Sequence, residues 1–122
     1  MTKRILVIED QEDNRRILRD LLSSVGYELI EAENGEDGVA AAAADRPDLI
    51  LMDIQLPLLD GYEATRRIKA QSALSAIPII AVTSYALSGD EDKARAAGCE
   101  GYVTKPFSPR ELLAKIREYL PQ

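Results

Sequence analysis

Short apolar runs alternate with helix-like segments along this 122-residue chain, and this alternation constrains the fold more than any other feature. The strand candidates are residues 4–9, 27–32, 49–53, 78–83 and 100–104. Three of them are nearly continuous apolar runs, which is typical of parallel strands covered on both faces. The repeating strand–helix pattern predicts an α/β fold of the (βα)5 type, with a doubly wound, five-stranded parallel sheet.

Helix signals lie between these runs. Gly26 and Gly98 stand where helices should end, and Ser108 with Glu111 predicts a capped start for the last helix. Apolar residues before Gly26 are spaced to cover one face of a helix: Ile17, Leu18, Leu21, Leu22 and Val25. Because neither a repeat nor a linker-like tract interrupts the pattern, we expect one domain over residues 1–122.

Charge and hydropathy exclude several classes of function. The net charge is −6 and the pI is about 4.7, which opposes the electrostatic attraction that direct nucleic-acid binding needs. No apolar run approaches the ~20 residues that cross a membrane. We therefore expect a cytoplasmic protein that binds neither nucleic acid nor membrane.

Histidine is absent, and Cys99 is the only cysteine. A disulfide within the chain and a multi-thiolate zinc site are therefore excluded, and Cys99 is interpreted as a small buried apolar residue. The absence of histidine excludes imidazole-based triads and metal sites. If phosphoryl transfer occurs here, the donor histidine must belong to another protein.

Polar residues follow four of the predicted strands. Glu9 and Asp10 follow the first, Asp53 ends the third, Thr83 ends the fourth, and Lys105 follows the fifth. Right-handed crossovers place the carboxyl ends of parallel strands at one edge, where ligands bind. Each residue alone has an ordinary explanation as a loop, cap or surface residue, but their joint placement predicts a site.

Crowded carboxylates repel one another unless a cation lies between them. A site with oxygen ligands and neither imidazole nor thiolate suits Mg²⁺. Asp53 could then act both as a metal ligand and as a nucleophile that forms an acyl phosphate. Lys105 and the hydroxyl of Thr83 would compensate the charge of the transferred group.

The chain closely resembles the receiver domains of two-component response regulators, over essentially its whole length. The matching segments are residues 5–10 (ILVIED), 49–57 (LILMDIQLP), 60–62 (DGY), 78–84 (PIIAVTS) and 101–107 (GYVTKPF). The resemblance implies a flavodoxin-like receiver fold with strand order 2-1-3-4-5. Within the family, the chain is similar to stand-alone DivK-type regulators and to the receivers of hybrid histidine kinases.

The resemblance also implies roles for residues of the predicted site. Asp53 would be the phosphoacceptor, and Glu9 and Asp10 would hold Mg²⁺ together with Asp53 and the backbone carbonyl of Gln55. Many receivers have aspartate in place of Glu9, so direct contact with the metal and contact through a water both stay open. Lys105 would pair with the phosphoryl oxygens, and the peptide bond between Lys105 and Pro106 would be cis.

Thr83 and Tyr102 resemble the switch residues of the family. Phosphorylation would draw Thr83 toward the phosphate, residues 84–89 would follow, and Tyr102 would turn into the vacated space. The face formed by the last strand and the last two helices would then change shape. Gln55 and Tyr85 could also set the phosphoryl lifetime, although packing or surface roles are nearly as well supported.

The resemblance implies a phosphorylated signalling protein that catalyses its own phosphorylation and dephosphorylation and is not an enzyme acting on a separate substrate. The phosphodonor would be a histidine kinase or a histidine phosphotransfer protein. If the chain is complete, its output must pass through a downstream protein target.

Three alternative functions fit the sequence less well. A Mg²⁺-dependent aspartyl phosphatase would carry a DxD motif after the first strand, which residues 9–12 (EDQE) do not match. A flavin or dinucleotide binder would need a glycine-rich turn there, and residues 10–14 contain no glycine. A phosphorylation-independent adaptor would not require the complete acidic site.

Overall fold

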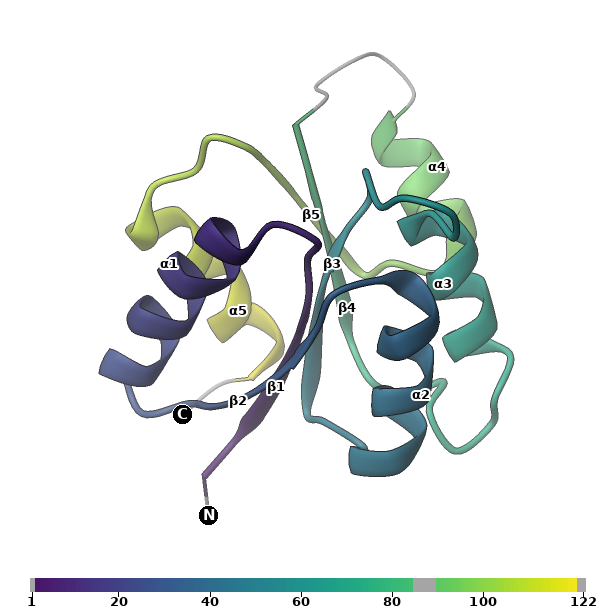
Figure 1. Cartoon of the computed structure of the whole chain (residues 1–122), viewed down its shortest axis with the longest axis horizontal. Coiled ribbons are helices and arrows are strands. Elements are labelled where there is room, and N and C mark those ends of the chain that lie inside the picture. Colours follow the sequence, from purple (N-terminus) through teal and green to yellow (C-terminus); the bar gives the residue numbers. More distant parts are fainter. Residues whose placement is uncertain (1, 85–89, 121–122) are drawn as a thin grey trace.

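The computed structural model describes residues 2–84 and 90–120, which form a parallel sheet between two layers of helices (Figure 1). The elements in chain order are β1 (Arg4–Ile8), α1 (Glu12–Ser24), β2 (Glu28–Ala32), α2 (Gly35–Asp45), β3 (Leu49–Asp53), α3 (Gly61–Lys69), β4 (Ile79–Thr83), α4 (Asp90–Ala97), β5 (Gly101–Thr104) and α5 (Pro109–Tyr119). All strand pairs are parallel, and the strand order is β2-β1-β3-β4-β5. The predicted fold class and strand order are confirmed.

Four of the five predicted strands are one residue too long at one end. Glu9 lies just beyond β1, although its N–H still donates to the carbonyl oxygen of Ala32 at 3.1 Å. Pro78 precedes β4 because proline has no N–H to offer a ladder, but its carbonyl oxygen accepts from the Ile50 N–H. These residues therefore extend the pairing by one hydrogen bond without belonging to a strand.

Helices α1 and α5 cover one face of the sheet, and α2, α3 and α4 cover the other (Figure 1). Within one strand, Ile5 and Val7 face α1 and α5, whereas Leu6 and Ile8 face the opposite helices. Both faces are thus buried, which explains why the strand residues are continuously apolar rather than alternating. Among residues 2–84 and 90–120, we find no helix with the length and apolar character that crossing a membrane requires.

The predicted face of α1 is confirmed except at one residue. Leu18 and Leu22 are buried, and Leu21 and Val25 are half-buried, but Ile17 is 60% exposed. Consecutive helical residues are rotated by about 100°, so a stripe centred on Leu18 and Leu22 leaves Ile17 at its margin.

Helix ends follow the predicted signals. The Ser108 side chain accepts a hydrogen bond from the Glu111 N–H at 3.0 Å, and Pro109 is the first residue of α5. Gly26 and Gly98, which follow α1 and α4, have φ of 96° and 117°. Such positive angles favour glycine, as expected at helix C-termini.

Gly61 brings the start of α3 close to the end of β3. A Cβ atom at this position would lie 2.4 Å from the carbonyl oxygen of Asp53 and 2.7 Å from the Cα of Ile54. Both are backbone atoms, so they cannot turn away as a side chain would. The absence of a side chain at Gly61 therefore fixes how closely α3 approaches Asp53.

We predict that Gly61→Ala lowers the free energy of unfolding by about 1–3 kcal/mol, because the added methyl group displaces backbone. Urea unfolding measures this. The exposed Ser72→Ala, a small change far from the contact, should alter stability by less than about 0.5 kcal/mol. Equal stability of the two variants would show that the close approach is not required.

Candidate functional site

The polar residues predicted from the strand ends meet at one edge of the sheet. Glu9 follows β1, Asp53 ends β3 and Thr83 ends β4, and their exposed fractions are 2%, 4% and 1%. Asp10 is half-buried, and Lys105 follows β5, where its N–H donates to the Thr83 carbonyl oxygen at 2.7 Å. Parallel pairing thus gathers all five residues.

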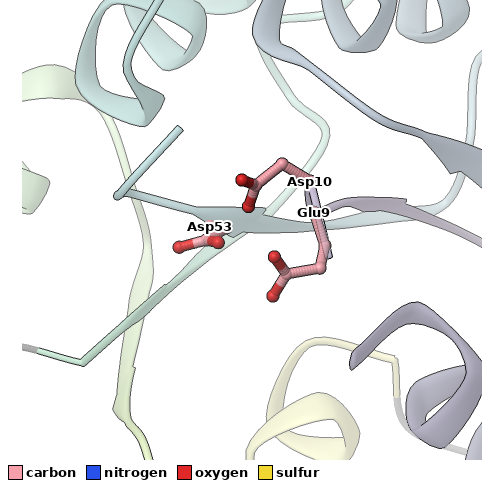
Figure 2. A group of neighbouring side chains, drawn as sticks. All are labelled: Glu9, Asp10 and Asp53. Carbon is pink, nitrogen blue, oxygen red and sulfur yellow. The ribbon is translucent and has the colours of Figure 1, made fainter. Parts of the chain in front are cut away.

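Three of these residues form an acidic cluster, which we define as Glu9, Asp10 and Asp53. Each offers a carboxylate oxygen, and the three oxygens lie within 4.8 Å of one another. Figure 2 shows the three carboxylates turned toward a common space. Lys105 is the adjacent cation: its Nζ lies 2.8 Å from Glu9 Oε1 and 3.5 Å from Asp53 Oδ2.

This crowding changes the acidities. Burial, followed by the hydrogen bond and repulsion from Glu9, raises the pKa of Asp53 from 3.8 to about 7, although Lys105 opposes the shift. Burial and Glu9 also raise the pKa of Asp10. Burial would raise the pKa of Glu9 too, but hydrogen bonds from Asp53, Lys105 and the Gln11 N–H outweigh it, so that pKa is lowered. Negative charge in the cluster is therefore only partly compensated by Lys105.

The donor set fits Mg²⁺. Three carboxylates offer hard oxygen ligands, and uncompensated charge on Asp10 and Asp53 favours a divalent cation. Gln55 lies two residues beyond Asp53, and its N–H donates to Asp53 Oδ1 at 3.0 Å. A cation held here would be bound by one edge of the sheet and the loop after β3.

Helix α1 contributes a residue that the sequence patterns did not predict. The Asn14 side chain donates to Glu9 Oε1 at 3.3 Å, on the same oxygen that accepts from Lys105. In the sequence, only its position near the start of the helix that follows Glu9 and Asp10 could have indicated that Asn14 lies at the site. The first turn of such a helix lies over the edge of the sheet.

Arg15 is a second residue that was missed. Its guanidinium is buried and donates to the Glu9 carbonyl oxygen at 2.7 Å and to the Glu12 carboxylate at 2.6 Å. It also contacts Glu33, which follows β2. Arg15 therefore fixes the backbone of Glu9, and thus the start of the acidic cluster, from the side of α1.

The Gln55 side chain connects the loop after β3 to the end of β4. Its Nε2 donates to the Thr83 hydroxyl oxygen, and its Oε1 accepts from the Ser84 N–H at 2.9 Å. From the sequence, Gln55 was predicted mainly as a metal ligand through its backbone carbonyl. A side-chain bridge cannot be read from spacing, because it depends on the rotamer.

The remaining predicted residues are placed as follows. Tyr102 lies in β5, is half-buried and packs against the core on the side of α2, α3 and α4. The peptide bond between Lys105 and Pro106 is cis. Cys99 is buried as predicted, and burial raises the pKa of its thiol to about 11. Tyr85 and most of the predicted moving segment, residues 85–89, lie outside the described residues.

A cleft of about 480 Å³ borders the site beside α1. Its lining includes the charged residues Glu9 and Lys105 and the apolar residues Ile17, Val82 and Phe107. The exposed Ile17 therefore faces a concave surface next to the acidic cluster.

Comparison with known proteins agrees with this geometry. The sequence profile of the response regulator receiver domain family matches residues 5–117. The chain is 45% identical to the polar-differentiation response regulator DivK of Brucella anthropi over 120 residues, which cover 98% of both proteins.

Solved structures show the same fold. The receiver domain of a sensor histidine kinase from Pseudomonas aeruginosa, solved with a magnesium ion coordinated in its active site cleft, is 38% identical with a TM-score of 0.92 over 100% of both chains. A chemotaxis protein of Vibrio cholerae is 27% identical with a TM-score of 0.93, covering 98% of this chain and 99% of that one.

The raised pKa of Asp53 predicts a pH-dependent stability without metal. Between pH 3.8 and about 7 the folded protein keeps a proton on Asp53 that the unfolded chain has lost, so stability falls as pH rises through this range. Asp53→Asn removes this penalty. We expect it to stabilise the protein at pH 8 by on the order of 2–4 kcal/mol in urea unfolding with a chelator present.

At pH 4 the gain from Asp53→Asn should fall below about 1 kcal/mol, because the folded carboxyl is protonated and the unfolded one, with a pKa of 3.8, is only about half ionised. Asp13→Asn, which changes an exposed carboxylate on α1, serves as the control at both values. A gain that does not depend on pH would contradict the assigned charge state.

Proposed function

The chain belongs to the response regulator receiver domain family of two-component signalling, and we propose that it accepts a phosphoryl group on Asp53 with the help of Mg²⁺. The observation that carries this proposal is the acidic cluster of Glu9, Asp10 and Asp53 beside Lys105. The site brings together a carboxylate that could act as a nucleophile, oxygen ligands that suit a cation, and an adjacent ammonium group. A mere adaptor would need none of them.

In the proposed transfer, an Asp53 carboxylate oxygen attacks the phosphorus of a phosphohistidine. A P–O bond forms, the N–P bond breaks, and the imidazole nitrogen leaves with the electron pair. The donor is a histidine kinase or a histidine phosphotransfer protein, because this sequence contains no histidine. Asp53 can do this only as a carboxylate, so its charge must be stabilised.

The acidic cluster and the Gln55 backbone carbonyl would hold Mg²⁺, with Glu9 either in direct contact or acting through a water. Bound Mg²⁺ would supply positive charge for the phosphoryl oxygens. Lys105 would release Glu9 Oε1, which it now contacts at 2.8 Å, and move its ammonium group toward the phosphoryl oxygens.

The signal would leave the site through Thr83 and Tyr102. The Thr83 hydroxyl would approach the phosphoryl group, and Tyr102 in β5 would turn inward. Such a change would alter the α4–β5–α5 face, which we propose binds the downstream protein. Moving this equilibrium from mostly off to mostly on takes ~5 kcal/mol, which a few charge-assisted hydrogen bonds can supply.

We predict that a small phosphodonor such as acetyl phosphate, with Mg²⁺, adds the mass of one phosphoryl group to the protein. Asp53→Asn should abolish the addition, because the amide is not a nucleophile, whereas Asp13→Asn should keep it. Intact-mass spectrometry measures both. Labelling that persists in Asp53→Asn would assign the acceptor to another residue, and no labelling at all would favour an adaptor.

Mg²⁺ binding is a separate prediction. Titration calorimetry should detect Mg²⁺ uptake by the protein, and Asp10→Asn should weaken it by roughly tenfold or more, since it removes one anionic oxygen ligand. Asp13→Asn should leave the affinity unchanged. A protein that takes up no Mg²⁺ would contradict the proposed metal site.

A further inference from the structure

The Gln55 carboxamide forms hydrogen bonds with two polar groups at the end of β4. Nε2 donates to the Thr83 hydroxyl oxygen, and Oε1 accepts from the Ser84 N–H at 2.9 Å. The Gln55 backbone N–H meanwhile donates to Asp53 Oδ1 at 3.0 Å. One residue therefore contacts both the acceptor carboxylate and the segment that would respond to its phosphorylation.

A phosphoryl group on Asp53 would bring nearly two negative charges and three strongly accepting oxygens to this edge. Backbone N–H and hydroxyl groups are the donors that stabilise such charge. The Ser84 N–H is one of these donors, but its acceptor in this structure is the Gln55 side-chain oxygen. The carboxamide oxygen and a phosphoryl oxygen would thus compete for the same Ser84 N–H.

We propose that the Gln55 side chain is a latch that holds Thr83 and Ser84 in the unphosphorylated arrangement. This proposal rests on the proposed function and adds a restraint on the switch. For the Ser84 N–H to bind a phosphoryl oxygen, it must leave Gln55 Oε1. The Thr83 hydroxyl oxygen accepts from Nε2, so that contact restrains where Thr83 lies and does not use the hydroxyl proton. The latch therefore opposes phosphorylation and lowers the population of the active state.

The chemistry of glutamine suits this role. A carboxamide carries one acceptor and one donor group on the same carbon, so it can bind an N–H and a hydroxyl oxygen together. Methionine has a similar length but offers neither strong group. The backbone of Gln55 is unchanged by substitution, so its carbonyl stays available to a cation.

Beryllofluoride with Mg²⁺ tests the latch, because its binding to Asp53 mimics a phosphoryl group at equilibrium and involves no attack by water. We expect Gln55→Met to lower the apparent dissociation constant for beryllofluoride by about three- to tenfold, since the hydrogen bond that competes for the Ser84 N–H and the one that restrains Thr83 are both lost. Gln55→Ala should act in the same direction. Gln71→Met, an exposed glutamine in the turn after α3, is the matched control and should change nothing.

Two further measurements separate a latch from a general structural effect. Mg²⁺ affinity is measured for each variant without beryllofluoride, so that beryllofluoride binding is compared at saturating Mg²⁺ and a change in the metal site is not counted as the latch. The Ser84 amide should exchange with solvent about tenfold faster in Gln55→Met than in the unsubstituted protein, because its acceptor is gone. Both are measured without a phosphoryl mimic.

Tighter beryllofluoride binding together with faster Ser84 exchange supports the latch. Unchanged or weaker binding in both Gln55 variants overturns it, as does a Ser84 amide that exchanges equally fast before and after substitution. If the unsubstituted protein binds no beryllofluoride at all, the proposed function itself fails, and the latch fails with it. The result for the unsubstituted protein alone distinguishes these two failures.

Discussion

The burial of carboxylates that also repel one another is the constraint on which the rest of this structure depends. Asp53 and Glu9 are almost fully buried at the edge of the sheet, and Asp10 lies beside them. Folding gathers these charges at a cost that Lys105 alone does not remove, as the raised pKa of Asp53 shows. Because the charges at this edge of the sheet are unfavourable, binding of a positively charged group there is favoured.

The scaffold keeps this unfavourable cluster in place from several sides. The register of the parallel strands fixes where the strand ends lie relative to one another. Gly61 lets α3 approach the carbonyl oxygen of Asp53. Arg15 holds the carbonyl oxygen of Glu9 from α1. Each of these contacts involves backbone, so the carboxylates are positioned by the main chain more than by their own side-chain preferences.

Much of the fold and the membership of the site could be predicted because both follow from periodicity and topology. Apolar runs locate the strands, and the residue that ends each run must lie at the same edge. Contacts that depend on rotamers could not be predicted, and the Gln55 carboxamide, Asn14 and Arg15 are examples. The exposure of Ile17 was missed for a related reason, since spacing alone does not locate the centre of a helix face.

The resting site already pairs its main donors with acceptors of its own. Lys105 donates to Glu9, the Gln55 N–H donates to Asp53, and the Ser84 N–H donates to the Gln55 side chain. Phosphorylation would therefore exchange acceptors instead of creating hydrogen bonds. An exchange leaves a net free energy of about 1–3 kcal/mol per bond, larger where the new acceptor is charged, and 1.4 kcal/mol already changes the ratio of the two states tenfold. Side chains that merely compete for these donors can thus set the balance of the switch without touching the phosphoryl group.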